Sequence, residues 1–292
     1  MDISRIIQKV KKIEIRSRLL SNQQFAGAYH TAFKGRGMQF SEVREYAYGD
    51  DIRHIDWNVS ARMQSPYVKL FQEEREQTVI FMVDISPSVL TSIGNTDRRE
   101  LIAEVVATLA FSANRSQDNT GLLLFDSEVK KYLPPAKGYQ QILQMIRSVM
   151  VTESTPAAAT NLEAAVHYYK TVHKRNAVIF LLSDFLFEDY KNTLSILSAR
   201  NDLIGVTVKD PLDDMLPDVG LIQVVDAETE KIEWVDTSSR HYKNWYQQQS
   251  QYRNSYFKKA FSEVNAATIQ LSDQDDYIKK LQVFFHQRAK RK

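Results

Sequence analysis

Apolar runs and helical spacings alternate along the middle of the chain, from residue 78 to residue 225. The run at 79–83, Val-Ile-Phe-Met-Val, is apolar at successive positions, which is typical of a central strand that is buried on both faces. This alternation predicts an α/β domain with a doubly wound, mostly parallel sheet. Further strands are expected at 121–125, 177–184 and 203–208, an edge strand at 129–133 that Pro134 and Pro135 end, and helices at 97–114, 139–149 and 161–174.

The segments on either side of this domain have other patterns. Residues 2–20 place isoleucine and valine on one helical face and lysine and arginine off it. Such a basic amphipathic helix either lies on a membrane surface or covers an apolar patch of its own protein, and we expect the second. At the other end we expect a hairpin at 222–225 and 231–235, helices at 240–264 and 275–288, and a strand at 268–271.

These patterns divide the chain into three parts. Residues 1–77 form an N-terminal helix and a module rich in arginine and aspartate, residues 78–225 form the α/β domain, and residues 226–292 form a C-terminal α/β extension. The first residues lack the apolar core of a signal peptide, and no apolar run approaches the ~20 residues of a transmembrane helix. We therefore expect a cytoplasmic protein without a transmembrane segment.

Composition excludes several classes of function. The 292 residues include no cysteine, which rules out disulfides, thiolate zinc sites and cysteine nucleophiles. Aromatic and basic residues interleave between Tyr242 and Phe261, where the alternatives are stacking on nucleic acid and packing on the core. The net charge is only +2, so no strong field attracts nucleic acid, and we expect packing.

Three oxygen-bearing side chains follow the first strand directly. Asp84, Ser86 and Ser88 occupy alternate positions immediately after the apolar run, so their side chains can turn toward one point. The carboxyl ends of strands in an open α/β sheet form the edge at which ligands bind. Carboxylate and hydroxyl oxygens suit Mg²⁺, Mn²⁺ or Ca²⁺ rather than zinc. The alternative is that Asp84, like Asp184 after the run 177–183, simply caps the helix that follows its strand.

This Asp-x-Ser-x-Ser loop resembles the metal ion-dependent adhesion site of von Willebrand factor type A domains. That family adds a threonine from a later loop and an aspartate after the fourth strand. Thr160, in Ala159-Thr160-Asn161-Leu162, is similar to the threonine, and Asp184, at the end of the apolar run 177–183, is similar to the aspartate. The resemblance implies a site for Mg²⁺ (or Mn²⁺ or Ca²⁺) built from Asp84, Ser86, Ser88, Thr160 and Asp184.

A second resemblance rests on the N-terminal module. Gly35-Arg36-Gly37 is followed by Phe40-Ser41-Glu42-Val43-Arg44-Glu45-Tyr46, then by Gly49-Asp50-Asp51-Ile52-Arg53-His54-Ile55-Asp56-Trp57 and Ala61-Arg62. These runs are similar to the hallmark of family 58 of the domains of unknown function, whose members carry a von Willebrand-like domain just downstream. The resemblance implies a bacterial protein that works beside a MoxR-type AAA+ ATPase.

The density of charge in this module predicts an interlocked polar network, because the planar guanidinium group pairs well with carboxylates. The module is either a docking face for the ATPase or a rigid unit that packs on the α/β domain, with Tyr46 and Trp57 as anchors. We expect the second. The charged residues concerned are Arg44, Arg53 and Arg62 among Glu42, Glu45, Asp50, Asp51 and Asp56.

These features predict a non-enzymatic adaptor that recognises proteins through its metal. Asp84 and Asp184 would balance the ion, so one glutamate or aspartate from a partner is its natural further ligand. With the ATPase, the adaptor would assemble or activate client proteins. The alternative is a Mg²⁺-dependent phosphohydrolase with Asp84 as nucleophile, although the second acid expected two residues later is Ser86 and no phosphate-binding lysine is identified. Asp126 either lines the site or is a turn residue, and we expect the turn.

Overall fold

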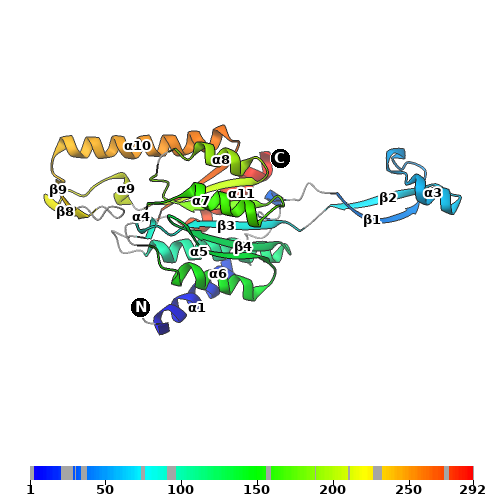
Figure 1. The fold of residues 1–292 in the computed structure, drawn as a ribbon, viewed down its shortest axis with the longest axis horizontal. Helices are drawn as coiled ribbons and strands as arrows, with labels where there is room; N and C mark the ends of the chain where they lie inside the picture. Colours follow the sequence, from blue (N-terminus) through cyan, green and yellow to red (C-terminus); the bar gives the residue numbers. More distant parts are fainter. Residues whose placement is uncertain are drawn as a thin grey trace.

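A six-stranded sheet forms the centre of the protein (Figure 1). The computed structural model describes residues 3–20, 29, 31–33, 38–73, 76–90, 97–155, 159–187, 189–209, 211–225, 232–272 and 276–291. The strand order is β10–β7–β6–β3–β4–β5, and all neighbours are parallel except β4 and β5. The strands are β3 (Thr78–Asp84), β4 (Asn119–Phe125), β5 (Val129–Ala136), β6 (Val178–Ser183), β7 (Asp202–Lys209) and β10 (Ala267–Ser272).

Both faces of this sheet are covered by helices, which explains why its central strands are apolar at every position. In β3, for example, Phe81 and Val83 pack into the apolar core on one face, and Ile80 and Met82 pack into the core on the other. The α/β class and the mostly parallel sheet predicted from the sequence are therefore confirmed.

The helices divide between the two faces (Figure 1). One face carries α1 (Ile3–Leu20), α5 (Arg98–Arg115), α6 (Tyr139–Val151) and α11 (Tyr277–Arg291), and the other carries α7 (Leu162–Val172), α8 (Lys191–Ser198) and α10 (Arg240–Glu263). Two short helices, α4 (Pro87–Leu90) and α9 (Pro211–Asp214), follow the carboxyl ends of β3 and β7.

The N-terminal helix α1 packs against α5, so it covers the protein's own surface as expected. Ile13 and Ser17 are fully buried there. The Arg16 guanidinium lies 2.9 Å from a carboxylate oxygen of Glu104 on α5. No helix in the described part of the chain combines the length and apolar character needed to cross a membrane.

The edge strand β5 is longer than the sequence predicted. Pro134 and Pro135 were expected to end it, but it continues to Ala136. A proline lacks the N–H group that a strand in the middle of a sheet would donate, whereas an edge strand has one side without a partner. The position of β5 at the sheet edge therefore accommodates both prolines.

The C-terminal segment contributes to the main sheet. β10 lies parallel to β7 at the edge opposite β5, so the sheet extends beyond residue 226 of the chain. The expected hairpin is present as a separate two-stranded sheet, β8 (Leu221–Val225) and β9 (Ile232–Asp236). The long helix α10 follows it and returns along the sheet (Figure 1).

Helix α10 meets β7 at a glycine. Gly205 has no side chain, and a Cβ atom there would lie only 2.4 Å from the ring of Phe261. Phe261 and Phe257 are buried at this contact, as the sequence predicted for this aromatic helix. The prediction is wrong for Trp245 and Tyr252, which remain 48% and 65% exposed.

Replacing Gly205 with alanine is expected to destabilise the fold by about 1–3 kcal/mol, the usual effect of overpacking a close contact. The added methyl group must push α10 away from β7. Urea unfolding followed by circular dichroism measures the loss. The double variant Gly205→Ala/Phe261→Leu should recover part of it, and a Gly205→Ala variant as stable as wild type would show that α10 is not held closely at this point.

A charged arm extends from the amino end of the sheet (Figure 1). It consists of β1 (Met38–Glu45) paired antiparallel with β2 (Tyr67–Glu73), and of the short helices η2 (Ile52–His54) and α3 (Trp57–Met63). Asp51 and Asp56 cap the two helices. The predicted polar network is largely internal to the arm: Arg44 pairs with Asp50 at 2.8 Å, Arg53 with Asp51 at 2.7 Å and Lys69 with Asp56 at 3.4 Å.

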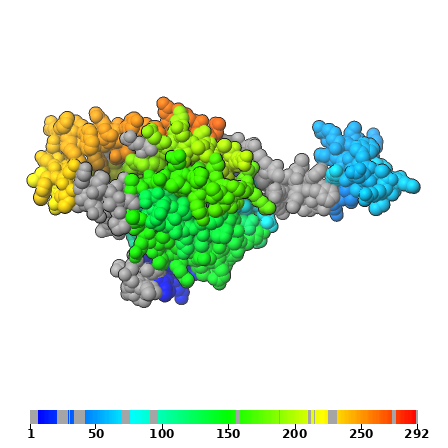
Figure 2. Space-filling view, viewed as in Figure 1, coloured from blue at the N-terminus to red at the C-terminus, as the bar shows by residue number. Residues whose placement is uncertain are grey.

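The arm does not use Trp57 as an anchor on the α/β domain, so that prediction is wrong. The Trp57 side chain is 72% exposed, and the arm lies apart from the body of the protein (Figure 2). Its ion pairs and helix caps are local, so they hold the arm together without the α/β domain. Tyr48, Ile52 and Met63 of the same arm are also exposed.

Candidate metal centre

The carboxyl ends of β3 and β6 lie side by side at the point where the strand order reverses. From β3 the sheet continues through β4 on one side and through β6 on the other. The loops that follow β3 and β6 therefore lead to opposite faces of the sheet. In open α/β sheets, ligands bind in the crevice that such a divergence leaves at the strand ends. Asp84 ends β3, and Asp184 follows the last residue of β6.

Asp84 is fully buried and both of its carboxylate oxygens accept hydrogen bonds. Oδ1 accepts from the backbone N–H of Ser86 at 2.9 Å. Oδ2 accepts from the hydroxyl of Ser183 at 2.7 Å and from that of Thr160 at 3.3 Å. The side chain is therefore fixed in orientation by three different parts of the chain.

The structure brings all five predicted residues to this one edge. Ser86 and Ser88 place their hydroxyl oxygens 3.1 Å apart on the loop after β3. Thr160 reaches Asp84 from the loop before α7. Asp184 acts on Asp84 through its charge. The hydroxyl of Ser88 lies near enough to stabilise the Asp184 anion.

Asp184 has an oxygen that no part of the described protein satisfies. The residue is 8% exposed, and its Oδ1 accepts the N–H of Leu186 at 3.2 Å. Its Oδ2 is buried and has no hydrogen-bond partner among the described residues. Buried polar atoms in folded proteins are nearly always paired, so this oxygen is available to a water molecule or a cation.

Burial makes both carboxylates costly to ionise. It raises the pKa of Asp84 to about 7, an effect to which the nearby charge of Asp184 adds. It also raises the pKa of Asp184 to about 6, although the Leu186 N–H, the Ser88 hydroxyl and the Arg98 guanidinium oppose the rise. A divalent cation between the two groups would remove both the repulsion and the desolvation penalty.

The donor set fits a hard divalent cation. It offers two carboxylates and three hydroxyls, all oxygen ligands of the kind that Mg²⁺, Mn²⁺ and Ca²⁺ prefer. Within the described residues, no group of three or more histidine, cysteine, aspartate or glutamate side chains is placed to hold a metal. A metal bound here would therefore depend on hydroxyl oxygens and water for its remaining ligands.

Three neighbours of the centre were missed by the sequence analysis. Ser183 donates to Asp84, and the only signal for it was a hydroxyl residue at the end of an apolar strand. Arg98, 4% exposed at the start of α5, holds both oxygens of Asp213 on α9 at 2.7 and 2.8 Å. No sequence pattern connects Arg98 with Asp213, because 115 positions separate them.

Asp126 is a buried turn residue, as expected. Its Oδ1 accepts the N–H of Glu128 at 3.1 Å, and its Oδ2 accepts the N–H of Thr155 at 2.8 Å. Its backbone carbonyl accepts the N–H of Asn161 at 2.8 Å. These bonds attach the segment that carries Thr160 to the end of β4, so Asp126 positions a residue of the centre without being part of it.

The fold and the site place this protein in a class of doubly wound α/β proteins. Its members combine two neighbouring aspartates, at the point where the strand order reverses, with a charged arm before the first strand of the main sheet. The family model described as protein of unknown function DUF58 matches residues 42–256. The chain belongs to this family. The matched region runs from β1 in the arm through most of α10.

Two mycobacterial proteins are among the relatives of this chain. An uncharacterised protein of Mycobacterium tuberculosis (strain H37Rv) is 29% identical over 197 residues, which are 67% of this chain and 62% of the relative. An uncharacterised protein of Mycobacterium bovis has the same identity and coverage. The chain thus spans less than two thirds of the length of these relatives.

Solved structures to which this chain is similar include the conserved hypothetical protein BatB from Bacteroides thetaiotaomicron. The TM-score is 0.47 at 15% identity, over 73% of this chain and 99% of that protein. The VWA domain of SpRpn10 gives a TM-score of 0.40 at 8% identity, over 70% of this chain and 93% of that domain.

Proposed function

We propose that this protein recognises other proteins through a divalent metal ion held by Asp84, Ser86, Ser88, Thr160 and Asp184. The observation that carries the proposal is the orphaned Oδ2 of Asp184, buried beside the buried carboxylate of Asp84. Two neighbouring carboxylates that burial penalises as anions are stabilised strongly by a cation bound between them.

The charge of such a centre favours an acidic partner. Asp84 and Asp184 balance a divalent ion, and the hydroxyls of Ser86, Ser88 and Thr160 add no charge. Mg²⁺ commonly keeps several positions for water. A glutamate or aspartate from a partner is the ligand that best replaces one of those waters, since it brings an anion to an electrophilic ion.

The rival function is phosphate-ester hydrolysis with Asp84 as nucleophile. The hydrogen bonds to both Asp84 oxygens argue against it, because they hold the carboxylate in a fixed, buried position and lower its nucleophilicity. One observation favours it: Lys209 lies with Asp184 in the same hollow and supplies a cation that the sequence did not identify. We propose recognition without catalysis, and a phosphatase assay with Mg²⁺ tests the rival directly.

The proposed partner is a MoxR-type AAA+ ATPase, with which the protein would assemble or activate client proteins in the cytoplasm. Membership of the family supports this proposal through the resemblance noted in the sequence. The arm and the candidate metal centre lie at opposite ends of β3, which would let one end hold the ATPase while the other holds a client.

Biolayer interferometry against the MoxR-type ATPase of the same genome tests the proposal. Binding is expected in Mg²⁺, with at least a tenfold loss in Asp84→Asn. The variant, not EDTA, is decisive, since the ATPase itself needs Mg²⁺ for its nucleotide. Asp118→Asn is the matched control, because Asp118 is also a buried carboxylate but precedes β4 at the other end of the sheet. Binding unaffected by Asp84→Asn would remove the metal from this interface and favour the arm. Steady Mg²⁺-dependent ester hydrolysis that Asp84→Asn abolishes would establish the rival.

A further inference from the structure

A buried arginine lies beside the candidate metal centre. Arg98 is the first residue of α5 and is only 4% exposed. A cation at the amino end of a helix is unfavourable, because the helix dipole is positive there. A buried charge is also costly unless it is paired. The stability of α5 therefore does not explain why an arginine occupies this position.

Arg98 is paired with Asp213 on the short helix α9. Its Nη2 donates to both carboxylate oxygens of Asp213, at 2.7 and 2.8 Å. The hydroxyl of Tyr246 on α10 donates to the backbone carbonyl of Leu212 at 2.9 Å, so α9 is also attached to α10. Asp213 is thus held in place from two sides, and it fixes the Arg98 guanidinium between α5 and α9.

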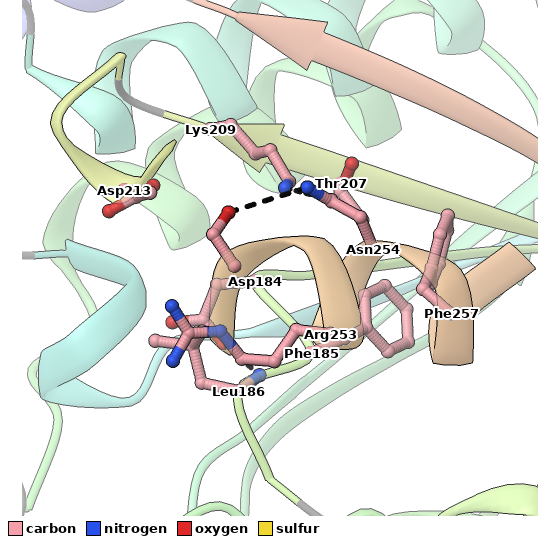
Figure 3. A pocket seen from close by; sticks show the side chains of 10 residues that line it. Asp184, Phe185, Leu186, Thr207, Lys209, Asp213, Arg253, Asn254 and Phe257 are labelled. Carbon is pink, nitrogen blue, oxygen red and sulfur yellow. Dashed lines mark hydrogen bonds between the residues drawn. The ribbon is translucent and has the colours of Figure 1, made fainter. Parts of the chain in front are cut away.

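Asp184 is close to both members of this ion pair. Asp184 and Asp213 line the same small hollow at the carboxyl ends of β6 and β7 (Figure 3). Burial raises the pKa of Asp184, the Arg98 guanidinium opposes the rise, and the Asp213 carboxylate adds to it. The charges of Arg98 and Asp213 therefore both reach the carboxylate that the proposed metal needs.

The unsatisfied oxygen of Asp184 suits two kinds of cation. Its Oδ2 is buried and has no hydrogen-bond partner among the described residues. Such an oxygen is stabilised either by a metal ion or by a guanidinium group. In the structure the Arg98 guanidinium is bound to Asp213, although its charge reaches Asp184. One cation of the protein and one from solution are therefore suited to the same oxygen.

We infer that Asp213 is a positioning residue of the metal centre: it holds Arg98 away from Asp184 and so keeps the oxygen of Asp184 available to a metal ion. The inference rests on the proposed metal-dependent recognition and adds a residue that controls the same site. Without the Asp213 charge, Arg98 would pair with Asp184, and its positive charge would repel a divalent ion. Asp213 thus acts on the metal site through Arg98.

Calorimetric titration with Mg²⁺ at pH 8 tests this inference. Asp213→Asn is expected to lower the affinity at least tenfold, because Arg98 loses its counter-charge and competes for Asp184. Arg98→Gln should bind Mg²⁺ at least as tightly as wild type, since the competing cation is gone. The double variant Arg98→Gln/Asp213→Asn should return to within about threefold of wild type, since two amides replace two opposite charges.

This pattern separates positioning from a purely structural role. If the ion pair only held α9 in place, Arg98→Gln would lower the affinity as much as Asp213→Asn does, and the double variant would not recover it. That result would overturn the inference. Circular dichroism checks that each variant is folded. Should Asp213→Asn fail to fold, Arg98→Gln decides alone: binding equal to or tighter than wild type supports the inference, and weaker binding overturns it.

Asp218→Asn is the matched control. Asp218 lies in the segment that follows α9 and pairs with Lys243 at 2.7 Å, in a more exposed position than Asp213. The variant removes the same charge and also breaks an ion pair, but it releases no cation beside Asp184. Its Mg²⁺ affinity should stay within about twofold of wild type, because exposed charges are screened. A loss as large as that of Asp213→Asn would show that total charge sets the affinity, which would count against the inference.

Crystal structures of the metal-free protein provide a readout that does not depend on the metal. In EDTA, the Arg98 guanidinium should lie within hydrogen-bond distance of Asp184 in Asp213→Asn, and on Asp213 in wild type. An Arg98 side chain that keeps its wild-type position in Asp213→Asn would overturn the inference.

These outcomes distinguish failure of this inference from failure of the proposed function. If wild type and Asp213→Asn bind Mg²⁺ equally well, the metal centre stands and the role of Asp213 is overturned. If wild type binds no Mg²⁺, the metal centre is overturned. The metal-free structure of Asp213→Asn then still decides whether Asp213 holds Arg98 away from Asp184.

Discussion

Asp84→Asn is expected to lower the affinity for Mg²⁺ at least 100-fold while the protein keeps its fold. The asparagine retains an oxygen for the Ser86 N–H, and the hydroxyls of Ser183 and Thr160 can turn to accept from its amide. What is lost is the negative charge that a divalent ion requires. Alanine would leave those donors unsatisfied, so asparagine separates metal binding from folding.

Thermal unfolding gives the expected result a magnitude. A ligand present at 100 times its dissociation constant stabilises the folded state by about 2.7 kcal/mol, which for a chain of this size raises the midpoint by about 5–10 °C. Wild type and the control Asp118→Asn should show this rise on adding Mg²⁺, and Asp84→Asn should not. In EDTA at pH 8, Asp84→Asn should unfold at or above the wild-type temperature, because it removes a repulsive buried anion. An equal Mg²⁺ response in Asp84→Asn, or equal calorimetric heats, would contradict the assignment of the site.

The second large effect is a loss of stability of the metal-free protein as pH rises. Burial raises the pKa of Asp84 to about 7, and that of Asp184 and of Asp118 to about 6, from 3.8 in each case. Between about pH 4 and pH 7 the folded state therefore holds more protons than the unfolded state, and the free energy of unfolding falls as pH rises. This contribution to stability is fully present below pH 3.8 and is lost above the folded pKa values.

Differences between variants isolate each group. At 1.36 kcal/mol for each pKa unit, the shift of Asp118 corresponds to on the order of 3 kcal/mol. Urea unfolding in EDTA at pH 4, 5.5 and 7 measures the free energy of unfolding. As pH rises, this free energy should increase in Asp118→Asn relative to wild type by about that amount, and in Asp84→Asn by at least as much. Saturating Mg²⁺ should remove or invert the gain for Asp84→Asn only, since the ion prefers the deprotonated pair. A gain for Asp84→Asn that is the same with and without Mg²⁺ would show that no cation meets this carboxylate.

Asp118 and Asp184 are both buried carboxylates, but their oxygens differ in whether they have hydrogen-bond partners. Asp118 is satisfied within the protein: Oδ1 accepts the N–H of Gln77 at 2.9 Å, and Oδ2 accepts the hydroxyl of Tyr29 at 3.3 Å. Asp184, by contrast, keeps a buried oxygen without a partner. Both are buried and both have a raised pKa, so burial alone does not identify a ligand site. The unsatisfied oxygen is what sets Asp184 apart from Asp118.

Local rules explain why the sequence predicted so much of this fold. The apolar residues of β3, β4, β6 and β7 are continuous because both faces of the sheet are covered, and that continuity is visible in the chain itself. A polar residue directly after such a strand must lie at the carboxyl edge, so the position of Asp84 followed from its place in the sequence. The details that failed, such as the end of β5 at Pro134, depend on which strand lies at the edge.

The arm shows the opposite case. Its arginines and aspartates pair within a few residues of one another, as in Arg53 with Asp51, so a polar network was predictable. Whether Trp57 packs against the α/β domain depends on where the arm points, and no local pattern contains that information. Trp57 is 72% exposed. The arm is therefore the second surface, after the candidate metal centre, at which partner binding should be tested.

By itself, the sequence determined the α/β class, most of the strands and helices, and the place of Asp84, Ser86 and Ser88 at the carboxyl edge, because strand ends are local properties. Thr160 and Asp184 were added by the resemblance to von Willebrand factor type A domains. Only the tertiary structure decided what surrounds them. Ser183 reaches Asp84 across 99 positions and Arg98 reaches Asp213 across 115. Gly205 lets Phe261 of α10 approach β7. Contacts of that kind arise from packing between distant segments. Their free energy depends on both segments together, so no short stretch of the chain predicts them.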